Sequence, residues 1–283
     1  MIFRQFGWTG EQVSVIGQGT WMIEGDAAGE RRAIETLQHG IDLGMRHIDT
    51  AEMYGNGRVE ELVGAAIAGR RNQVFLASKV LPSNASFDRT QRACERSLKR
   101  LRTDWLDLYM LHWPGEHPIR ETMRAMEKLV SGGLIRSIGV SNFDVEELAA
   151  AENALRHERL VADQVLYNLE ERGIERRLLP YCERRDIALV AYSPFGHGRF
   201  PSSRSVGGRV LALIAERHGR TPRQVALNFL TRHSGVFAIP KAGRPEHAIE
   251  NAGSVGWDLT DEDIAMIERA FPVPHHDVPL AVL

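Results

Sequence analysis

The amino-acid sequence predicts an α/β protein of the (β/α)8 TIM-barrel class, with an N-terminal β-hairpin and extra helices near the C-terminal end. Three observations support this prediction. The length of 283 residues suits one such barrel. Short apolar runs alternate with helical patterns at an interval of roughly thirty residues, which is the length of one βα unit. No long polar linker interrupts this alternation, so we expect a single domain over residues 1–283.

Eight short apolar runs are the predicted barrel strands. Most of them lack a strict alternation of polar and apolar residues, which is typical of parallel strands that are buried on both faces. The expected strands are 15–19, 47–49, 74–78, 106–111, 135–140, 162–167, 188–192 and 236–240. Residues 2–16 stand outside the repeat and carry apolar residues around a glycine-containing turn region at 7–10, which predicts a hairpin.

The segments between the strands have the three-to-four period of helices, and local signals mark some of their ends. Thr221 precedes Pro222 and is followed by Gln224, the pattern of a capping box with Pro at the first helical position. Thr260 is followed by three acidic residues, which the helix dipole favours at an N-terminus. Five glycines are expected to end helices: Gly40, Gly44, Gly69, Gly132 and Gly133.

Composition and charge exclude several classes of function. Hydrophobic residues make up 43% and charged residues 25% of the chain, the usual mixture for a soluble globular protein. A net charge of −2 with scattered Lys and Arg indicates no nucleic-acid partner. No apolar run reaches the roughly 20 residues of a membrane span, and no secretion signal is recognisable, so we expect a cytoplasmic protein. Cys94 and Cys182 fall in separate predicted helices, which predicts neither a disulfide nor a metal site.

Four polar side chains are expected to converge at one end of the barrel. Asp49 ends the second predicted strand, Lys79 follows the third, and His112 follows the fourth. Tyr54 lies shortly after Asp49, in the loop over the same edge. In barrels of this class the reactive residues lie at the C-terminal ends of the strands. The sequence therefore predicts a reactive site with these four residues as its catalytic candidates.

This set of side chains is suited to delivering a proton to a carbonyl oxygen. A free tyrosine has a pKa of about 10, which is high for proton exchange at neutral pH. A neighbouring ammonium stabilises the phenolate, so we expect Lys79, held in place by Asp49, to lower the pKa of Tyr54. The His112 imidazole could hydrogen-bond a substrate carbonyl and hold it for attack. No side chain in this set can donate a hydride, so the chemistry requires a cofactor.

These residues and their surroundings resemble the aldo-keto reductase family, and the similarity runs almost end to end. No single matching segment is decisive, but the ordered series is highly specific. Within the family, the chain looks most like the bacterial branch that reduces small aldehydes such as methylglyoxal. The matching segments are Gly-Thr-Trp at 19–21, Asp-Thr-Ala-Glu-Met-Tyr-Gly-Asn-Gly at 49–57, Ser-Lys-Val at 78–80, and the segments 106–114, 138–143, 164–168, 191–196 and 239–241.

The resemblance implies an NADPH-dependent oxidoreductase that reduces small aldehydes or ketones to alcohols. Tyr54 would be the proton donor, with Lys79 and Asp49 tuning it and His112 orienting the carbonyl. The implied substrate contacts are Trp21, Met53, Tyr54, His112, Trp113 and Phe143. The implied cofactor contacts are Gly19, Thr20, Trp21 and Asp49; Ser141, Asn142, Gln164 and Tyr192 at the nicotinamide; Ser193, Pro194, Phe195 and Gly196 at the pyrophosphate; and Ile239, Lys241, Ala242, Arg244, His247, Glu250 and Asn251 toward the adenosine end.

One departure from the family concerns the choice of cofactor. Relatives that select NADPH usually carry a hydroxyl residue just after the lysine and an arginine six positions beyond it. Ala242 and His247 occupy these two positions after Lys241. A neutral imidazole does not offer the fork of donors that a guanidinium offers to a phosphate, although Arg244 could compensate. We therefore expect NADPH, with NADH as the alternative cofactor.

Two other functions fit the same sequence. One is a nicotinamide-nucleotide-sensing regulatory or partner subunit, and the other is a sugar or alcohol dehydrogenase that works in the oxidative direction. The complete set of four catalytic candidates argues against a pure sensor. No heptad seam is visible, so we expect a monomer. The stretch 198–208 is interpreted either as a loop that folds over the cofactor or as a disordered segment, and the proline-containing tail from Phe271 is expected to border the mouth of the site.

Overall fold

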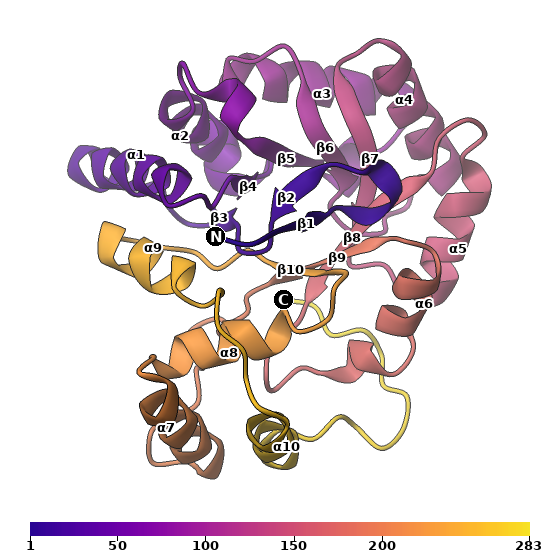
Figure 1. The fold of residues 1–283 in the computed structure, drawn as a ribbon. Helices are drawn as coiled ribbons and strands as arrows, with labels where there is room; N and C mark the ends of the chain where they lie inside the picture. The colour runs from indigo at the N-terminus through magenta and orange to yellow at the C-terminus, as the bar shows by residue number, and fades with distance from the viewer.

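Eight parallel strands form the central barrel of the protein (Figure 1). The computed structural model describes residues 1–283. Its main sheet has the strand order β10-β9-β8-β7-β6-β5-β4-β3. The strands are β3 (Gln18–Gly19), β4 (His47–Asp49), β5 (Phe75–Val80), β6 (Leu106–Leu111), β7 (Ile135–Ser141), β8 (Leu160–Leu166), β9 (Ala188–Tyr192) and β10 (Val236–Ala238). Parallel bridges from Ile16 to Ala238 and from Gly19 to Lys241 join the first strand to the last. The predicted fold class is confirmed.

The barrel strands are buried on both faces, as their sequence pattern predicted. All six residues of β6 and all seven residues of β8 are buried. Each of the eight predicted strands is present, with small differences at the ends. The largest difference is at β3, where Val15 donates its amide to the carbonyl of Ile2 and accepts a hydrogen bond from the amide of Ala238. Residue 15 therefore links the N-terminal hairpin to the barrel.

The predicted hairpin closes the N-terminal end of the barrel. Its strands β1 (Phe3–Gln5) and β2 (Gln12–Ser14) pair antiparallel and lie across the barrel in Figure 1. Phe6 is fully buried and packs on Phe75 and Phe237, with ring centroids 4.8 and 4.9 Å apart. Phe75 is the first residue of β5, so this aromatic contact fills the end of the barrel where the strands begin. The opposite end, where the strands finish, remains available for a site.

Helices surround the barrel on its outside (Figure 1). They are α1 (Ala27–Asp42), α2 (Arg58–Ala66), α3 (Phe87–Leu101), α4 (Ile119–Ser131), α5 (Val145–Ala154), α6 (Leu178–Arg184), α7 (Val206–His218), α8 (Pro222–Leu230), α9 (Pro245–Ala252) and α10 (Asp261–Ala270). The predicted capping boxes are present at Thr221, before α8, and at Thr260, before α10. None of these helices combines the length and the apolar character that a membrane span requires.

Two predictions about glycines are wrong. Gly40 does not end a helix but lies inside α1, where a side chain would collide with the buried Gln18. Gly207 and Gly208, expected in a loop or a disordered segment, lie in the first turn of α7 after the capping residue Ser205. A side chain at Gly208 would collide with the neighbouring backbone. At these positions, glycine is explained by close packing against other parts of the chain and not by a turn.

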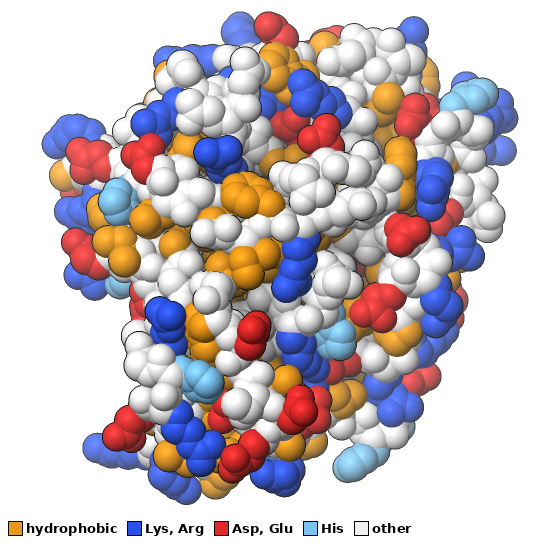
Figure 2. Space-filling view, in the orientation of Figure 1, with side chains coloured by type: hydrophobic (Ala, Val, Ile, Leu, Met, Phe, Trp, Pro, Cys, Tyr) orange, Lys and Arg blue, Asp and Glu red, His pale blue; other side chains and the backbone are white.

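Acidic and basic side chains are interspersed on the face that carries the hairpin (Figure 2). This face shows no extended patch of one charge sign, which agrees with the small net charge of −2.

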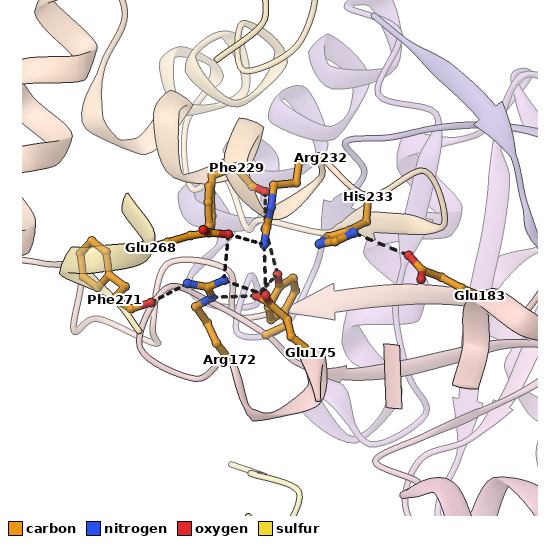
Figure 3. A network of polar contacts seen from close by, with 9 residues as sticks. Arg172, Glu175, Glu183, Phe229, Arg232, His233, Glu268 and Phe271 are labelled. Carbon is orange, nitrogen blue, oxygen red and sulfur yellow. Dashed lines mark hydrogen bonds and ion pairs between the residues drawn. The ribbon is translucent and has the colours of Figure 1, made fainter. Parts of the chain in front are cut away.

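A buried arginine cluster joins the loop after β8 to α8 and α10 (Figure 3). Arg172 is 2% exposed, and two of its guanidinium nitrogens donate to the two carboxylate oxygens of Glu175, each at 2.7 Å. The third nitrogen donates to the carbonyl of Phe271, which follows α10. Arg232 donates to the same Glu175 carboxylate at 3.0 Å and lies over the ring of Phe229. Because its buried charges are paired, the cluster fixes the start of the C-terminal tail.

We expect Arg172→Ala to lower the free energy of unfolding by about 3 kcal/mol. Removing one partner from a buried ion pair costs about 3–5 kcal/mol, and Arg232 still partly compensates the Glu175 charge. Chemical denaturation followed by circular dichroism measures this change. Arg58→Ala is the control, because Arg58 forms its ion pairs with Glu30 and Glu61 at the surface. An equal loss of stability in the two variants would contradict a special role for the buried cluster.

Candidate active site

The four catalytic candidates lie together at the C-terminal end of the barrel. Asp49 is the last residue of β4, Lys79 lies near the end of β5, and His112 directly follows β6. Tyr54 begins a 3-10 turn, Tyr54–Gly57, between β4 and α2. All four residues are buried, with exposed fractions of 9% or less. The alignment of three neighbouring strands therefore brings residues from separate parts of the chain into one site.

Lys79 uses all three of its N–H donors inside this site. Its Nζ donates to Asp49 Oδ2 at 2.7 Å, to the carbonyl of Thr50 at 3.0 Å and to the Tyr54 hydroxyl oxygen at 3.2 Å. An ammonium group has no lone pair and cannot accept a hydrogen bond. The phenol oxygen must therefore accept from Lys79, and the phenol proton remains free. The contact with Lys79 thus leaves the Tyr54 hydroxyl able to donate to another group.

The expected lowering of the Tyr54 pKa is wrong for this site. Burial raises the pKa of Tyr54 above its ordinary value, and the opposing effect of Lys79 is smaller. The physical reason is that the phenol is only 9% exposed, which disfavours the phenolate more strongly than one neighbouring cation stabilises it. At neutral pH the hydroxyl keeps its proton, which is the state that a proton donor needs.

The Lys79–Asp49 ion pair is enclosed by protein and fully hydrogen-bonded. Burial acts to lower the pKa of Lys79, but Asp49 and Tyr54 together outweigh burial and raise this pKa above its usual value. The second carboxylate oxygen of Asp49 accepts a hydrogen bond from Gln164 Nε2 at 2.7 Å. The pair therefore links the ends of β4, β5 and β8, and it keeps a charged ammonium beside the phenol.

His112 is a neutral imidazole beside the phenol. Burial, with a smaller contribution from Lys79, lowers the pKa of His112 to about 2. The imidazole meets the Tyr54 ring edge to face, with centroids 5.7 Å apart. Its Nδ1 has no hydrogen-bond partner. A neutral imidazole can donate one hydrogen bond to a carbonyl oxygen, but it carries no second proton to transfer.

The turn after Tyr54 depends on its Gly-Asn-Gly sequence. Gly55, Asn56 and Gly57 have φ angles of 53°, 52° and 92°, so three successive residues adopt the left-handed conformation. Glycine has no side chain to oppose this conformation, and asparagine tolerates it better than most residues. The sequence therefore encodes the tight turn that leads from the phenol into α2.

A cavity of about 540 Å³ opens beside the four catalytic candidates. Its walls come from the ends of β3, β4, β7 and β9, from the loops after β3, β4, β6, β7, β9 and β10, from Gln164 in β8 and from Leu283 in the tail. Most of the predicted cofactor and substrate contacts line this one cavity: Gly19, Thr20, Trp21, Asp49, Met53, Tyr54, His112, Trp113, Ser141, Asn142, Gln164, Tyr192, Ser193, Pro194, Phe195, Ile239 and Lys241. Lys79 lies behind the wall, fully buried.

Polar side chains at the ends of β7 and β9 bond to each other and to backbone carbonyls at the ends of the neighbouring strands β6 and β8. The Tyr192 hydroxyl donates to Asn142 Oδ1 at 2.8 Å, and Asn142 Nδ2 donates to the carbonyl of His112 at 3.1 Å. The Ser141 hydroxyl donates to the carbonyl of Gln164 at 2.8 Å. These bonds fix the aromatic ring of Tyr192 relative to the catalytic candidates.

Some predicted site residues lie outside this cavity: Phe143, Gly196, Ala242, Arg244, His247, Glu250 and Asn251. Phe143, expected as a wall of the substrate pocket, is 2% exposed and packs in the main hydrophobic core, so that prediction is wrong. The residue before it, Asn142, has a left-handed backbone with φ 61°, which redirects the chain at this point. The Phe143 ring is therefore directed into the core, while the Asn142 amide faces the cavity.

Most of the residues predicted for the adenosine end lie outside the cavity, and their exposure varies. Arg244 Nη2 lies 3.3 Å from His247 Nε2 at the start of α9. Lys241 donates to the carbonyl of Met22 at 3.4 Å. Glu250 accepts a hydrogen bond from the Thr221 hydroxyl at 2.7 Å, which ties α9 to the start of α8. Asn251 is 2% exposed and belongs to the packing of α9.

Four residues that line the cavity were missed by the sequence prediction: Met22, His197, Gly198 and Leu283. The His197 ring stacks on Trp21, with centroids 4.9 Å apart and an interplanar angle of 17°. Gly196, His197 and Gly198 all have positive φ angles, so the paired glycines were the available signal for this loop. Leu283 agrees with the expectation that the tail borders the mouth. The Trp21–His197 contact depends on how two distant loops meet, which the sequence does not reveal.

The residues around the cavity fit a nicotinamide dinucleotide. Trp21 and Tyr192 supply flat aromatic surfaces beside the catalytic candidates, and Gln164 supplies an amide. Lys241, on the part of the cavity wall after β10, supplies a cation that can bind a phosphate. A side chain at Gly19 would collide with the carbonyl of Ile239, so two strand ends approach closely and leave bare backbone at the cavity wall. Apolar and aromatic walls with a few placed polar groups are typical of cofactor sites.

Comparison with known proteins agrees with this geometry. The sequence model of the aldo/keto reductase family matches residues 15–271. Methylglyoxal reductase YeaE of Escherichia coli (strain K12) is 42% identical over 259 residues, which cover 92% of this chain and 91% of that protein. Glyoxal reductase of Bacillus subtilis (strain 168) is 36% identical, with 92% and 89% covered. The crystal structure of an aldo-keto reductase from Klebsiella pneumoniae in complex with NADPH has a TM-score of 0.94 at 42% identity, covering 100% of this chain and 99% of that chain. The chain therefore belongs to the aldo/keto reductase family of oxidoreductases.

Proposed function

We propose that the protein reduces small aldehydes or ketones, in particular 2-oxoaldehydes of the methylglyoxal type, to alcohols with NADPH as the source of hydride. The observation that carries this proposal is the hydrogen bond from Lys79 Nζ to the Tyr54 hydroxyl oxygen. It leaves the phenol proton free in a buried site, next to the neutral imidazole of His112. Two such groups can orient and protonate one carbonyl oxygen.

Tyr54 is the general acid in this proposal. His112 donates a hydrogen bond to the carbonyl oxygen of the substrate and orients it. The Tyr54 hydroxyl then transfers its proton to that oxygen as negative charge develops there. Lys79 stabilises the phenolate that remains, and Asp49 keeps Lys79 in place and charged. When bound, NADPH supplies the hydride that the carbonyl carbon receives.

Cofactor binding would use the polar groups at both ends of the cavity. Ser141, Asn142 and Gln164 would bind the carboxamide of the nicotinamide, and Tyr192 would stack on its ring. Lys241, assisted by Arg244 and His247, would bind the 2′-phosphate of the adenosine. The NADPH complex of the similar Klebsiella pneumoniae enzyme supports NADPH over NADH.

The preference for small carbonyl compounds is supported by the walls of the cavity. Trp21, Met53 and Trp113 supply apolar surface around Tyr54 and His112. The 36% exposure of Trp113 indicates an open mouth. The names of two similar proteins, a methylglyoxal reductase and a glyoxal reductase, indicate small aldehydes as substrates of those relatives.

An absorbance assay with NADPH and a panel of small aldehydes tests the proposed activity directly. Loss of NADPH absorbance with methylglyoxal is the expected result. A protein that only senses the nucleotide would bind NADPH without turnover of any aldehyde. A dehydrogenase that works in the oxidative direction would instead reduce NADP⁺ with sugars or alcohols.

Tyr54→Phe should bind NADPH normally and lose about 10²–10⁴-fold in the rate of aldehyde reduction, because that is the usual contribution of general acid catalysis. Fluorescence titration measures cofactor binding, and absorbance measures turnover. Tyr167→Phe is the matched control, because the Tyr167 hydroxyl contacts Glu175 away from the cavity. Near-normal reduction by Tyr54→Phe would remove this residue from the proposed role.

His247→Arg should favour NADPH over NADH by about threefold to tenfold more than the unaltered protein does. An arginine offers two parallel donors to a phosphate, which a neutral imidazole cannot match. The ratio of the two dissociation constants measures this preference. His157→Arg adds the same charge in the exposed segment before β8, at the opposite end of the barrel, and should leave the ratio unchanged. An unchanged ratio in His247→Arg would mean that the 2′-phosphate binds elsewhere.

A further inference from the structure

We propose that Glu52 is a positioning residue that fixes the Tyr54 loop against β5 and thereby sets the distance between the Tyr54 hydroxyl and Lys79. Glu52 lies two residues before Tyr54 and is 9% exposed. It contacts neither Tyr54 nor His112 through a hydrogen bond, and it does not line the cavity. The inference rests on the proposed role of Tyr54 as the general acid.

The backbone of the Tyr54 loop continues the pairing of β4 with β5 beyond the end of β4. The amide of Thr50 donates to the carbonyl of Ala77 at 3.0 Å. The amide of Glu52 then donates to the carbonyl of Lys79 at 3.3 Å. These bonds have the even spacing of a parallel ladder, in which every second residue of one strand bonds to the neighbouring strand. The loop is therefore attached to the residue that carries the ammonium.

The Glu52 carboxylate provides the next bond of this ladder. In a regular parallel ladder, the amide of Leu81 would donate to the backbone carbonyl of residue 52. It donates instead to Glu52 Oε1, at 2.8 Å. Asn84 Nδ2 donates to the same oxygen at 2.9 Å, and Arg96 Nη2 lies 3.6 Å from Oε2. Because the side chain replaces the backbone carbonyl, the backbone is free to turn away from β5 toward Tyr54.

Two hydrogen bonds and two short chain segments, 52–54 and 79–81, together form a closed circuit that includes Tyr54. Glu52 is two residues before Tyr54, and Leu81 is two residues after Lys79. The hydrogen bond between Glu52 and Leu81 closes one side of the circuit, and the bond between Lys79 and Tyr54 closes the other. A shift of the loop at Glu52 must therefore move the hydroxyl relative to the ammonium. A misplacement of about 1 Å can reduce the rate of a chemical step on the order of 100-fold.

Asp107 resembles Glu52 in its contacts and serves as a control. It separates an effect on the position of the Tyr54 loop from a general effect on stability. Its carboxylate is also buried, accepts a β5 amide hydrogen bond from Leu76 at 2.9 Å, and pairs with Arg71 at 2.7 Å. Leu76 lies near the beginning of β5, at the end of the barrel that is distant from Tyr54. Asp107 and Glu52 thus hold the same strand at opposite ends, and only Glu52 holds the Tyr54 loop.

The experiment compares the single-turnover rate of methylglyoxal reduction, by stopped-flow absorbance of bound NADPH, in Glu52→Ala, Glu52→Gln, Glu52→Asp and Asp107→Ala. The dissociation constant of NADPH and the melting temperature are measured for each variant. Glu52→Ala should slow the single turnover about 10- to 100-fold, with the NADPH dissociation constant within about twofold of the unaltered protein. Glu52→Gln keeps an acceptor oxygen at the same reach and should restore the rate to within about threefold. Asp107→Ala should lower the melting temperature but retain most of the rate.

The Glu52→Asp variant provides a second measurement in case Glu52→Ala does not fold. It keeps the charge but shortens the side chain, so it should fold and still be slow. Three outcomes would overturn the inference: a normal rate in folded Glu52→Ala or Glu52→Asp, a rate in Glu52→Gln as low as that in Glu52→Ala, or an equal slowing in Asp107→Ala. Tyr54→Phe is measured alongside. Normal turnover in Tyr54→Phe refutes the proposed function, whereas slow turnover there with normal turnover in the Glu52 variants refutes only the role of Glu52.

Discussion

The buried ion pair between Lys79 and Asp49 is the constraint on which the rest of the site depends. Lys79 is 0% exposed and Asp49 is 2% exposed, so bulk water stabilises these two charges far less than it would at the surface. Burying two charges costs several kcal/mol per ion unless the geometry and the remaining hydrogen bonds compensate. Here the ammonium uses its three donors, and both carboxylate oxygens accept. The ends of β4, β5 and β8 must keep their relative positions, because a shift of any of them would leave a buried charge unpaired.

Burial shifts the pKa values of two neighbouring side chains, Tyr54 and His112, in opposite directions. Burial raises the pKa of Tyr54 and lowers the pKa of His112, so both side chains are neutral at neutral pH. In the proposed mechanism, the neutral phenol retains the proton that it delivers, and the neutral imidazole orients the carbonyl oxygen without competing as an acid. The Lys79 ammonium donates a hydrogen bond to the phenol oxygen, so in the proposed mechanism it would stabilise the phenolate that forms when the proton leaves.

Features that are encoded locally could be predicted from the sequence, and features that depend on packing could not. The capping boxes at Thr221 and Thr260 are set by residues within one turn, and both are present. Gly40 carries the local signal of a helix end, yet its packing against Gln18 keeps it inside α1. The predicted lowering of the Tyr54 pKa is wrong for a similar reason. The sequence shows which charges are near the phenol, but not how little water reaches it.

The catalytic candidates are held more firmly than the residues predicted for the adenosine end. In the proposed function this difference separates the chemistry from the choice of cofactor. At the catalytic end, the ion pair is buried and its hydrogen bonds measure 2.7 to 3.2 Å. Among the residues predicted for the adenosine end, Lys241 and Arg244 are exposed, and their side chains have only contacts of 3.4 and 3.3 Å. A substitution among exposed, loosely held side chains leaves no buried charge unpaired, so it disturbs the fold little. Ala242 and His247 are half-buried beside them and hold no buried charge. In the proposed function these two residues can therefore change in sequence, and with them the preference for the 2′-phosphate, while Tyr54 and the Lys79–Asp49 ion pair stay in place.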